Sequence, residues 1–148
     1  MMLRTATRIA GLFMAALLVA ACDTTPVSKE EASMVNYGPR PDHWQDSVKS
    51  YLKLRLVDPT AAIIEFRTQP QQLYQRKVGL RDVQYGWAVC VWVNDKNPQG
   101  HYDGFYPMTF FFREEKIVAV NNGPDDFGVI GATYAREQCK QLGAPFEQ

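Results

Sequence analysis

Residues 83–112 read VQYGWAVCVWVN, then DKNPQGHYDG, then FYPMTFFF. The two outer segments are dense in aromatic and β-branched residues, and the middle one is polar with proline and glycine. This pattern is typical of two paired strands joined by a wide loop. Side chains alternate along a strand, so Val91 and its apolar neighbours two residues away point to one face, and Cys90 with Ala88 points to the other. Because both faces are apolar, we expect the first strand to be covered on both sides and to lie inside the sheet.

A helix is expected upstream of this stretch. Asp42 is predicted as its N-cap, with Gln45 completing a capping box, and Asp58-Pro59 should end it. The apolar residues at near-helical spacing are Trp44, Val48, Tyr51, Leu52 and Leu56.

The remaining segments predict further strands and a second helix. Strands are expected over residues 61–67 and 117–120, with a polar break at 69–72 followed by a weak edge strand at 73–80. The last helix should begin near Asp125 or Asp126 and stop at Gly143. Its apolar face would be Ala132, Ala135, Cys139 and Leu142. The predicted fold is therefore α+β, a small antiparallel sheet of about four to five strands with an N-terminal and a C-terminal helix packed on it.

Residues 1–21 have the features of a secretory signal peptide. Arg4 and Arg8 supply a positive start, and the following apolar run is too short for a comfortable membrane span of about 20 residues. Val19-Ala20-Ala21-Cys22 resembles the lipobox of bacterial lipoproteins. The resemblance implies cleavage before Cys22, transfer of diacylglycerol to its sulfur and acylation of the new amine. The alternative is an ordinary signal peptide followed by a chance cysteine.

The lipobox resemblance divides the chain into three parts. These are a signal peptide (1–21), a lipidated cysteine with a flexible tether (22–40), and a globular domain (41–148). The domain would be held at the membrane by its lipid and would face the periplasm. Asp23 follows the lipidated cysteine, and in enteric-type bacteria this residue favours retention in the inner membrane.

Charge and spacing exclude several classes of function. The chain has 16 basic and 16 acidic residues, and loss of Arg4 and Arg8 with the leader leaves a slight negative excess. Nucleic-acid binding requires a basic face, so it is not expected. The sequence has no HxxxH or CxxC spacing, and we predict neither a metal site nor a cofactor. An envelope protein is a possible partner, and the sequence leaves the oligomeric state open.

Two cysteines remain once Cys22 is lipidated. Cys90 lies on the central strand and Cys139 on the inner face of the last helix, so their sulfurs can meet if that helix crosses the sheet. A disulfide is permitted in the oxidising envelope. The alternative is two buried free thiols that pack as small hydrophobic groups.

The loop after the central strand is the one place where polar residues gather beside aromatic ones. The candidate binding residues are Asn94, Lys96, Asn97, His101, Tyr102 and Asp103. The alternative is that asparagine, aspartate, glycine and proline here only build a wide turn. His101 and Asp103 have the residue types of a general base and its orienting carboxylate, but their separation on a loop is more typical of a turn. We predict no catalytic residue.

Four motifs also resemble a family of small uncharacterised proteobacterial lipoproteins. They are Asp58-Pro59, Gly86-Trp87-Ala88-Val89-Cys90, Val93-Asn94-Asp95-Lys96-Asn97 and Gly100-His101-Tyr102-Asp103-Gly104-Phe105. Asp95, His101 and Asp103 depart from the family pattern. The family has no established activity, so the resemblance implies a class of protein and no mechanism.

Three hypotheses follow for the function. The first is a non-catalytic, lipid-anchored envelope protein whose sheet domain serves binding or assembly. The second is a periplasmic enzyme acting on cell-wall or glycan material through Asp103, His101 or Glu65, which would require carboxylates about 5 to 10 Å apart. The third is a lipoprotein subunit of a secretion apparatus.

Overall fold

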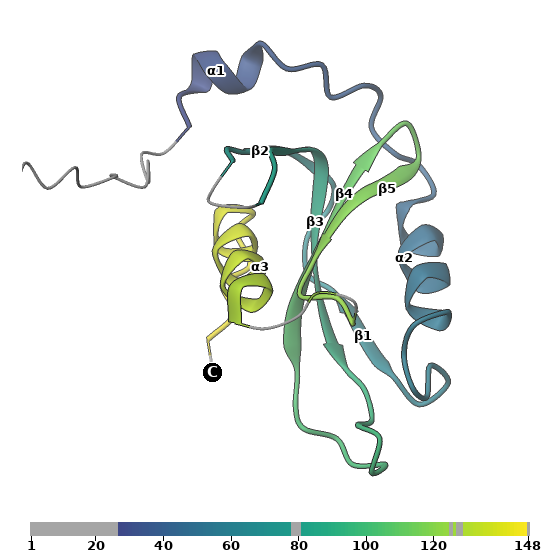
Figure 1. The fold of residues 1–148 in the computed structure, drawn as a ribbon. Coiled ribbons are helices and arrows are strands. Elements are labelled where there is room, and N and C mark those ends of the chain that lie inside the picture. The colour runs from purple at the N-terminus through teal and green to yellow at the C-terminus, as the bar shows by residue number, and fades with distance from the viewer. Residues whose placement is uncertain (1–26, 78–80, 125, 127–128, 148) are drawn as a thin grey trace, which may run out of the picture.

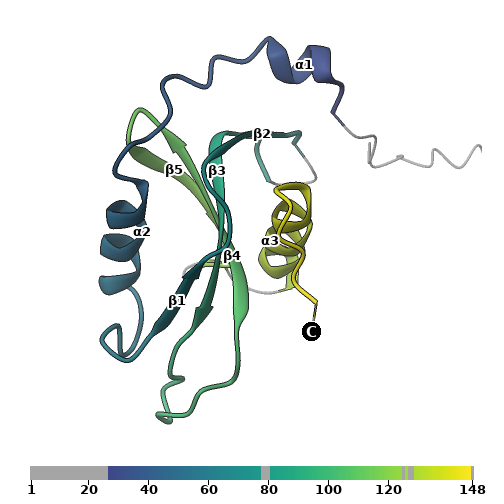
Figure 2. The same cartoon turned by 180° about the vertical axis from the view of Figure 1, so that it is seen from behind.

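An antiparallel sheet forms the middle layer of the domain, with a helix on each face (Figure 1). The computed structural model describes residues 27–77, 81–124, 126 and 129–147. Helix α2 (Trp44–Lys53) covers one face and α3 (Val129–Gln141) the other, and the view from behind in Figure 2 shows the same three layers. The arrangement confirms the predicted α+β class.

Strand β3 (Gln84–Asn94) lies inside the sheet, as its sequence predicts. Its neighbours are β1 (Ile63–Phe66) and β2 (Gln71–Gln75) on one side and β4 (Tyr106–Arg113) on the other, and β5 (Lys116–Asn121) pairs with the far edge of β4. β1 pairs with the second half of β3 and β2 with its first half. Strand β2 begins inside the segment predicted as a polar break, and residues 78–80 of the predicted edge strand lie outside the described residues.

Large apolar side chains fill the space between α2 and the sheet. The fully buried ones come from β3, β4 and α2, and they are Val48, Leu52, Val89, Val91, Val93, Met108, Phe110 and Phe112. Aromatic rings meet edge to face at both ends of the helix, with 5.1 Å between the ring centres of Trp44 and Phe66 and 5.4 Å between those of Tyr51 and Phe110. Full burial of one such side chain contributes about 1.5–3 kcal/mol, so this face supplies most of the hydrophobic stabilisation.

The predicted capping box at the start of α2 is wrong. His43 occupies the N-cap position and its side chain makes no capping bond. The carboxylate of Glu115 instead accepts the backbone N–H groups of Asp42 (2.5 Å) and His43 (3.1 Å). Glu115 lies in the tight turn between β4 and β5, so a distant residue satisfies the free amides of the helix start and places a negative charge there.

Residues 28–40 pack on the domain, which differs from the flexible tether expected over 22–40. Helix α1 (Lys29–Ser33) is attached to the end of β2 by an ion pair between Glu31 and Arg76. The ring of Tyr37 is 7% exposed and its hydroxyl donates to the carbonyl of Ala32. The indole Nε1–H of Trp87 donates to the carbonyl of Gly38 at 3.0 Å. Specific contacts thus fix residues 28–40, although their composition alone is typical of a flexible linker.

Candidate functional site

Asn97 organises the loop that the sequence singles out for binding. Its Oδ1 accepts the N–H groups of Gln99 and His101, both at 3.0 Å, and its Nδ2 donates to the carboxylate of Asp103 at 3.0 Å. Three of the six candidate binding residues, Asn97, His101 and Asp103, are therefore brought together, and the contacts among them build the turn.

The other side of this loop is attached to the connection between α2 and β1. The ammonium of Lys96 lies 3.3 Å from the carboxylate of Asp58, and the hydroxyl of Tyr102 donates to the carbonyl of Ala61 at 2.7 Å. The hydroxyl of Thr60 and then Lys96 hold the pKa of Asp58 below its ordinary value. Lys96 and Tyr102 thus tie two loops together at one end of the molecule.

Asn94, the sixth candidate, ends β3 and has a buried Oδ1 with no partner within the part of the chain that the structure describes. Nearby, the phenol of Tyr106 donates to Asp95 at 3.0 Å. Burial raises the pKa of Tyr106, and the Asp95 carboxylate raises it further, so the phenol stays protonated and acts as a hydrogen-bond donor.

The groups named for an enzyme reaction have other partners. Asp103 accepts hydrogen bonds from Asn97, and Glu65 on β1 forms an ion pair with Arg67 at 2.9 Å. His101 is exposed at the tip of the loop. No described contact joins any two of His101, Asp103 and Glu65. Within the described ranges, no group of three or more His, Cys, Asp or Glu side chains could hold a metal ion.

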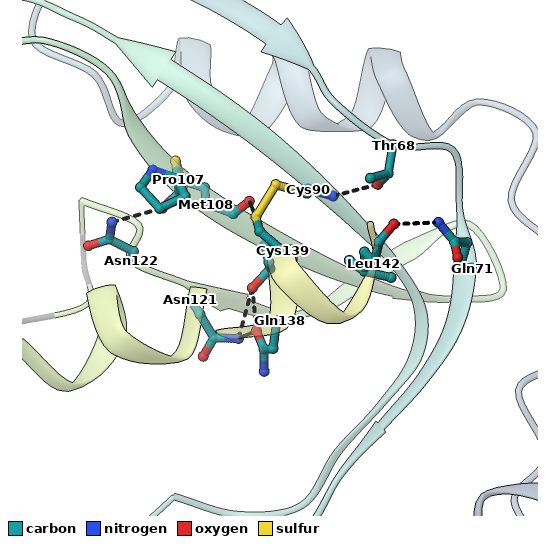
Figure 3. Close-up of a disulfide and its surroundings, with 11 residues drawn as sticks. Thr68, Gln71, Cys90, Pro107, Met108, Asn121, Asn122, Gln138, Cys139 and Leu142 are labelled. Atoms are coloured by element: carbon teal, nitrogen blue, oxygen red, sulfur yellow. Dashed lines mark hydrogen bonds between the residues drawn. A yellow bond between two sulfur atoms is a disulfide. The ribbon is translucent and has the colours of Figure 1, made fainter. Parts of the chain in front are cut away.

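A disulfide joins Cys90 on β3 to Cys139 on α3, which confirms the predicted pairing (Figure 3). Both cysteines are completely buried. The backbone N–H of Cys90 donates to the hydroxyl of Thr68, which lies where the edge of the sheet is interrupted between β1 and β2. The bond fixes α3 to the middle of the sheet.

A buried polar cluster that the sequence did not predict lies beside the disulfide. Thr109 on β4, Asn121 on β5 and Gln138 on α3 are each completely buried. The amide of Gln138 accepts from Thr109 at 2.5 Å and from Asn121 at 2.8 Å, and Asn121 also donates to Gln84. One signal was available: position 138 adjoins Cys139 on the predicted apolar face of the helix, yet it is polar.

The cluster continues outward to the turn that precedes α3. Arg81 donates to Asn121 at 2.6 Å and forms an ion pair with Asp126. Asp126 also accepts the N–H of Asn122 at 2.8 Å and lies against Gly131 in the first turn of α3. Asp125, the other predicted cap, lies outside the described residues. The polar groups of the cluster satisfy one another, so it is suited to fixing the position of α3.

The helix ends as predicted, with Gly143 in a left-handed conformation at φ 86°. The N–H of Ala144 reaches the carbonyl of Cys139, and that of Gly143 reaches Lys140, which together satisfy the last carbonyls of the helix.

The candidate binding loop lines neither of two open depressions on the described part of the surface. The first, of about 400 Å³, lies between the start of β4 and α3, and its lining includes Pro107, Pro124 and Arg136. The second, of about 360 Å³, runs along β5 beside Tyr51. Among the residues that the structure describes, no helix is long and apolar enough to cross a bilayer. The predicted signal peptide, Cys22 and Asp23 lie outside those residues.

Comparison of the chain with models of known protein families, with curated proteins and with solved structures gives no significant match. The function is therefore inferred from the residues of this chain.

Proposed function

We propose that this chain is a lipid-anchored protein of the bacterial cell envelope whose helix–sheet–helix domain serves binding or assembly in the periplasm, without catalysis. The observation that carries the proposal is the lipobox-like Val19-Ala20-Ala21-Cys22 after a positively charged start and an apolar run. Several acyl chains would hold the protein stably, since each buried methylene contributes about 0.8 kcal/mol. Asp23 favours retention in the inner membrane.

The pairing of Cys90 with Cys139 supports an address outside the cytoplasm. Structural disulfides persist in oxidising compartments and are rare in the cytosol, where thiol systems reduce them. The bond is a second observation, independent of the leader, that agrees with export.

The contacts of the polar residues support binding or assembly over hydrolysis. His101, Asp103 and Glu65 are the groups that an enzyme acting on cell-wall material would use. Asp103 and Glu65 have partners that explain their presence as parts of a turn and of a surface ion pair. A general base and its orienting carboxylate require direct contact or a single intervening water, and no described contact joins His101 to Asp103.

The lipid anchor is tested by expressing the full-length chain with its own leader and determining the mass of the mature protein. We expect a chain that begins at Cys22, carries diacylglycerol and one further acyl group, and sediments with membranes. The Cys22→Ala variant should lose the lipid mass and palmitate labelling. Recovery of the unmodified full-length chain from the cytosol, or of an unlipidated chain beginning at Asp23, would contradict the proposal.

The binding role is tested separately by crosslinking in intact cells followed by purification through the mature domain. A specific envelope protein should be recovered with the wild-type chain. Release of peptidoglycan fragments by the purified protein, lost in the Asp103→Asn variant, would instead establish the enzyme alternative.

A further inference from the structure

Strand β5 forms one edge of the sheet, and its outer side has no partner strand in the part of the chain that the structure describes. It pairs with β4 alone, and within the described ranges no backbone group outside β4 bonds to residues 116–120 (Figure 1). The strand contains no proline, so each of its residues has both an N–H and a carbonyl. The backbone groups that point away from β4 can therefore pair with a further strand.

The two edges of the sheet differ in continuity and in their side chains. The opposite edge is interrupted between β1 and β2, where Pro70 lies, and the charged pair of Glu65 and Arg67 stands at the end of β1. Strand β5 instead has an apolar run (residues 117–120), of which Val118 is 41% exposed. Breaks and charges protect an edge against pairing, so β5 is the edge that is better suited to pair.

An open depression follows the edge of β5. It has a volume of about 360 Å³, and its lining includes the whole apolar run together with Tyr51 and Asp126. Tyr51 lies on the α2 face of the sheet, and Asp126 lies against the first turn of α3 on the other face. The depression therefore runs along the edge of the strand, and a segment lying in it would meet apolar side chains over the length of the run.

The edge of β5 is complementary to a second copy of itself. Two β5 strands can lie antiparallel about a twofold axis between Val118 and Ala119. Ile117 of one copy then faces Val120 of the other, and every residue of the apolar run meets an apolar partner. The bulge of β5 lies at this axis, so both strands have the same irregularity there. Because the opposite edge is interrupted and charged, such pairing closes at two copies.

Charges at the two ends of β5 are also complementary in this arrangement. Lys116 is exposed, and within the described ranges no carboxylate pairs with it. It would lie opposite Asn121 of the second copy. The carboxylate of Asp126 accepts the N–H of Asn122 at 2.8 Å, directly after that position, and its other oxygen pairs with Arg81. Lys116 of each copy would therefore reach Asp126 of the other, since a carboxylate accepts several donors.

We propose that two copies of this chain associate through their β5 strands, which pair antiparallel and join the two sheets into one. The inference deepens the assembly role proposed above and rests on that role; it does not depend on the lipid. The contact is small, so its dissociation constant in solution should be about 10–100 μM. Anchoring both copies in one membrane would raise their effective concentration and favour the pair.

The test is sedimentation equilibrium of the whole mature chain, residues 22–148, with Cys22→Ala so that neither a lipid nor a free thiol joins two copies. We expect a monomer–dimer equilibrium. Val118→Lys should weaken it by about tenfold or more, because each dimer would then hold two lysines in its apolar centre. Ile63→Lys is the matched control, since Ile63 is 47% exposed on β1 at the opposite edge, and it should leave dimerisation unchanged.

A second pair of variants tests the charges at the ends of β5. Lys116→Glu should weaken dimerisation by about fivefold at low salt, the size expected of two exposed ion pairs, and by less at high salt. Lys49→Glu makes the same change of charge near the opposite edge, where the ammonium of Lys49 lies 5.8 Å from the ring centre of Phe66 on β1. That control should dimerise like the wild-type chain.

Amide hydrogen exchange locates the contact, and circular dichroism confirms that each variant is folded. Exchange at residues 117–120 should slow as the protein concentration rises, whereas exchange in β1 should not change. A chain that stays monomeric up to about 1 mM, a dimer that Val118→Lys leaves intact, or unchanged exchange at residues 117–120 would overturn the proposal. Protection of those residues only by a different envelope protein would also overturn it. A lipidated chain that stays monomeric would refute the dimer and leave the anchor intact.

Discussion

Replacing Cys90 and Cys139 by alanine, singly and together, should give a coupling free energy of about 4 kcal/mol between the two positions. The bond closes a loop between cysteines 49 residues apart. For that length the chain-entropy relation gives about 4 kcal/mol at 25 °C. Each single variant loses the whole cross-link together with the packing of one sulfur, and the double variant loses the same cross-link only once. The two single losses therefore sum to about 4 kcal/mol more than the loss in the double variant.

The packing of helix α3 makes this disulfide more important than the length of the loop it closes would suggest. Its buried residues are Gly131, Ala135, Gln138 and Cys139, none of them a large apolar side chain. By contrast α2 buries Trp44, Val48 and Leu52. Reduction of the wild-type protein should therefore accelerate amide hydrogen exchange in α3 before it affects α2.

The free energies of unfolding are to be measured by urea denaturation followed by circular dichroism, in a Cys22→Ala background that removes the third thiol. The denatured, unreduced protein should show no reactive thiol. A coupling free energy near zero, or two titratable thiols, would refute the reasoning, because two unbonded cysteines lose their packing independently.

Three further perturbations test other parts of the structure. Gly86→Ala should lower the free energy of unfolding, measured in urea, by about 3 kcal/mol, because its Cβ would lie 2.4 Å from a backbone oxygen of β4. Gly104→Ala is the control, since φ there is positive but the space is open, and it should lower the free energy of unfolding clearly less. Equal losses in the two variants would contradict the clash. The hydrogen bond from the Asp42 N–H lowers the pKa of Glu115 in the folded state. The stabilisation by the Glu115 carboxylate is therefore present above pH 4.5, the ordinary pKa, and is lost as pH falls through the lower folded pKa. Urea titrations at several pH values should show a weaker pH dependence in Glu115→Gln, and identical profiles would argue against the cap. Tyr37→Ala should destabilise the domain by about 3 kcal/mol if residues 28–40 belong to the fold, whereas an unchanged urea midpoint would support a free tether.

The sheet and its two covering helices could be predicted because they depend on local periodicity. Residues 87–93 are apolar at both odd and even positions, and that pattern indicates a strand buried on both faces. The helix stop at Gly143 also follows from local chemistry, since only a residue tolerant of positive φ fits there. The pairing of Cys90 with Cys139 followed from their places on two elements that must pack together.

The features that the sequence did not predict depend on residues far apart in the chain. Glu115 caps a helix 72 residues before it, and no local pattern around Asp42 indicates that contact. The depression beside Arg136 lies where β5 ends before the start of β4 is covered, and periodicity does not fix strand ends to within two residues. The candidate loop was noticed for its polar residues, but the structure uses most of them to build its own turn.

The contacts of residues 28–40 also set where a membrane-held domain would stand. Ser28 lies six positions after Cys22, and six extended residue steps span at most about 21 Å. A lipid on Cys22 would thus keep α1 close to the headgroups. Figure 1 places the first turns of α3, which line the depression beside Pro107, at the end of that helix farther from α1. That depression would then lie on the side of the domain away from the lipid.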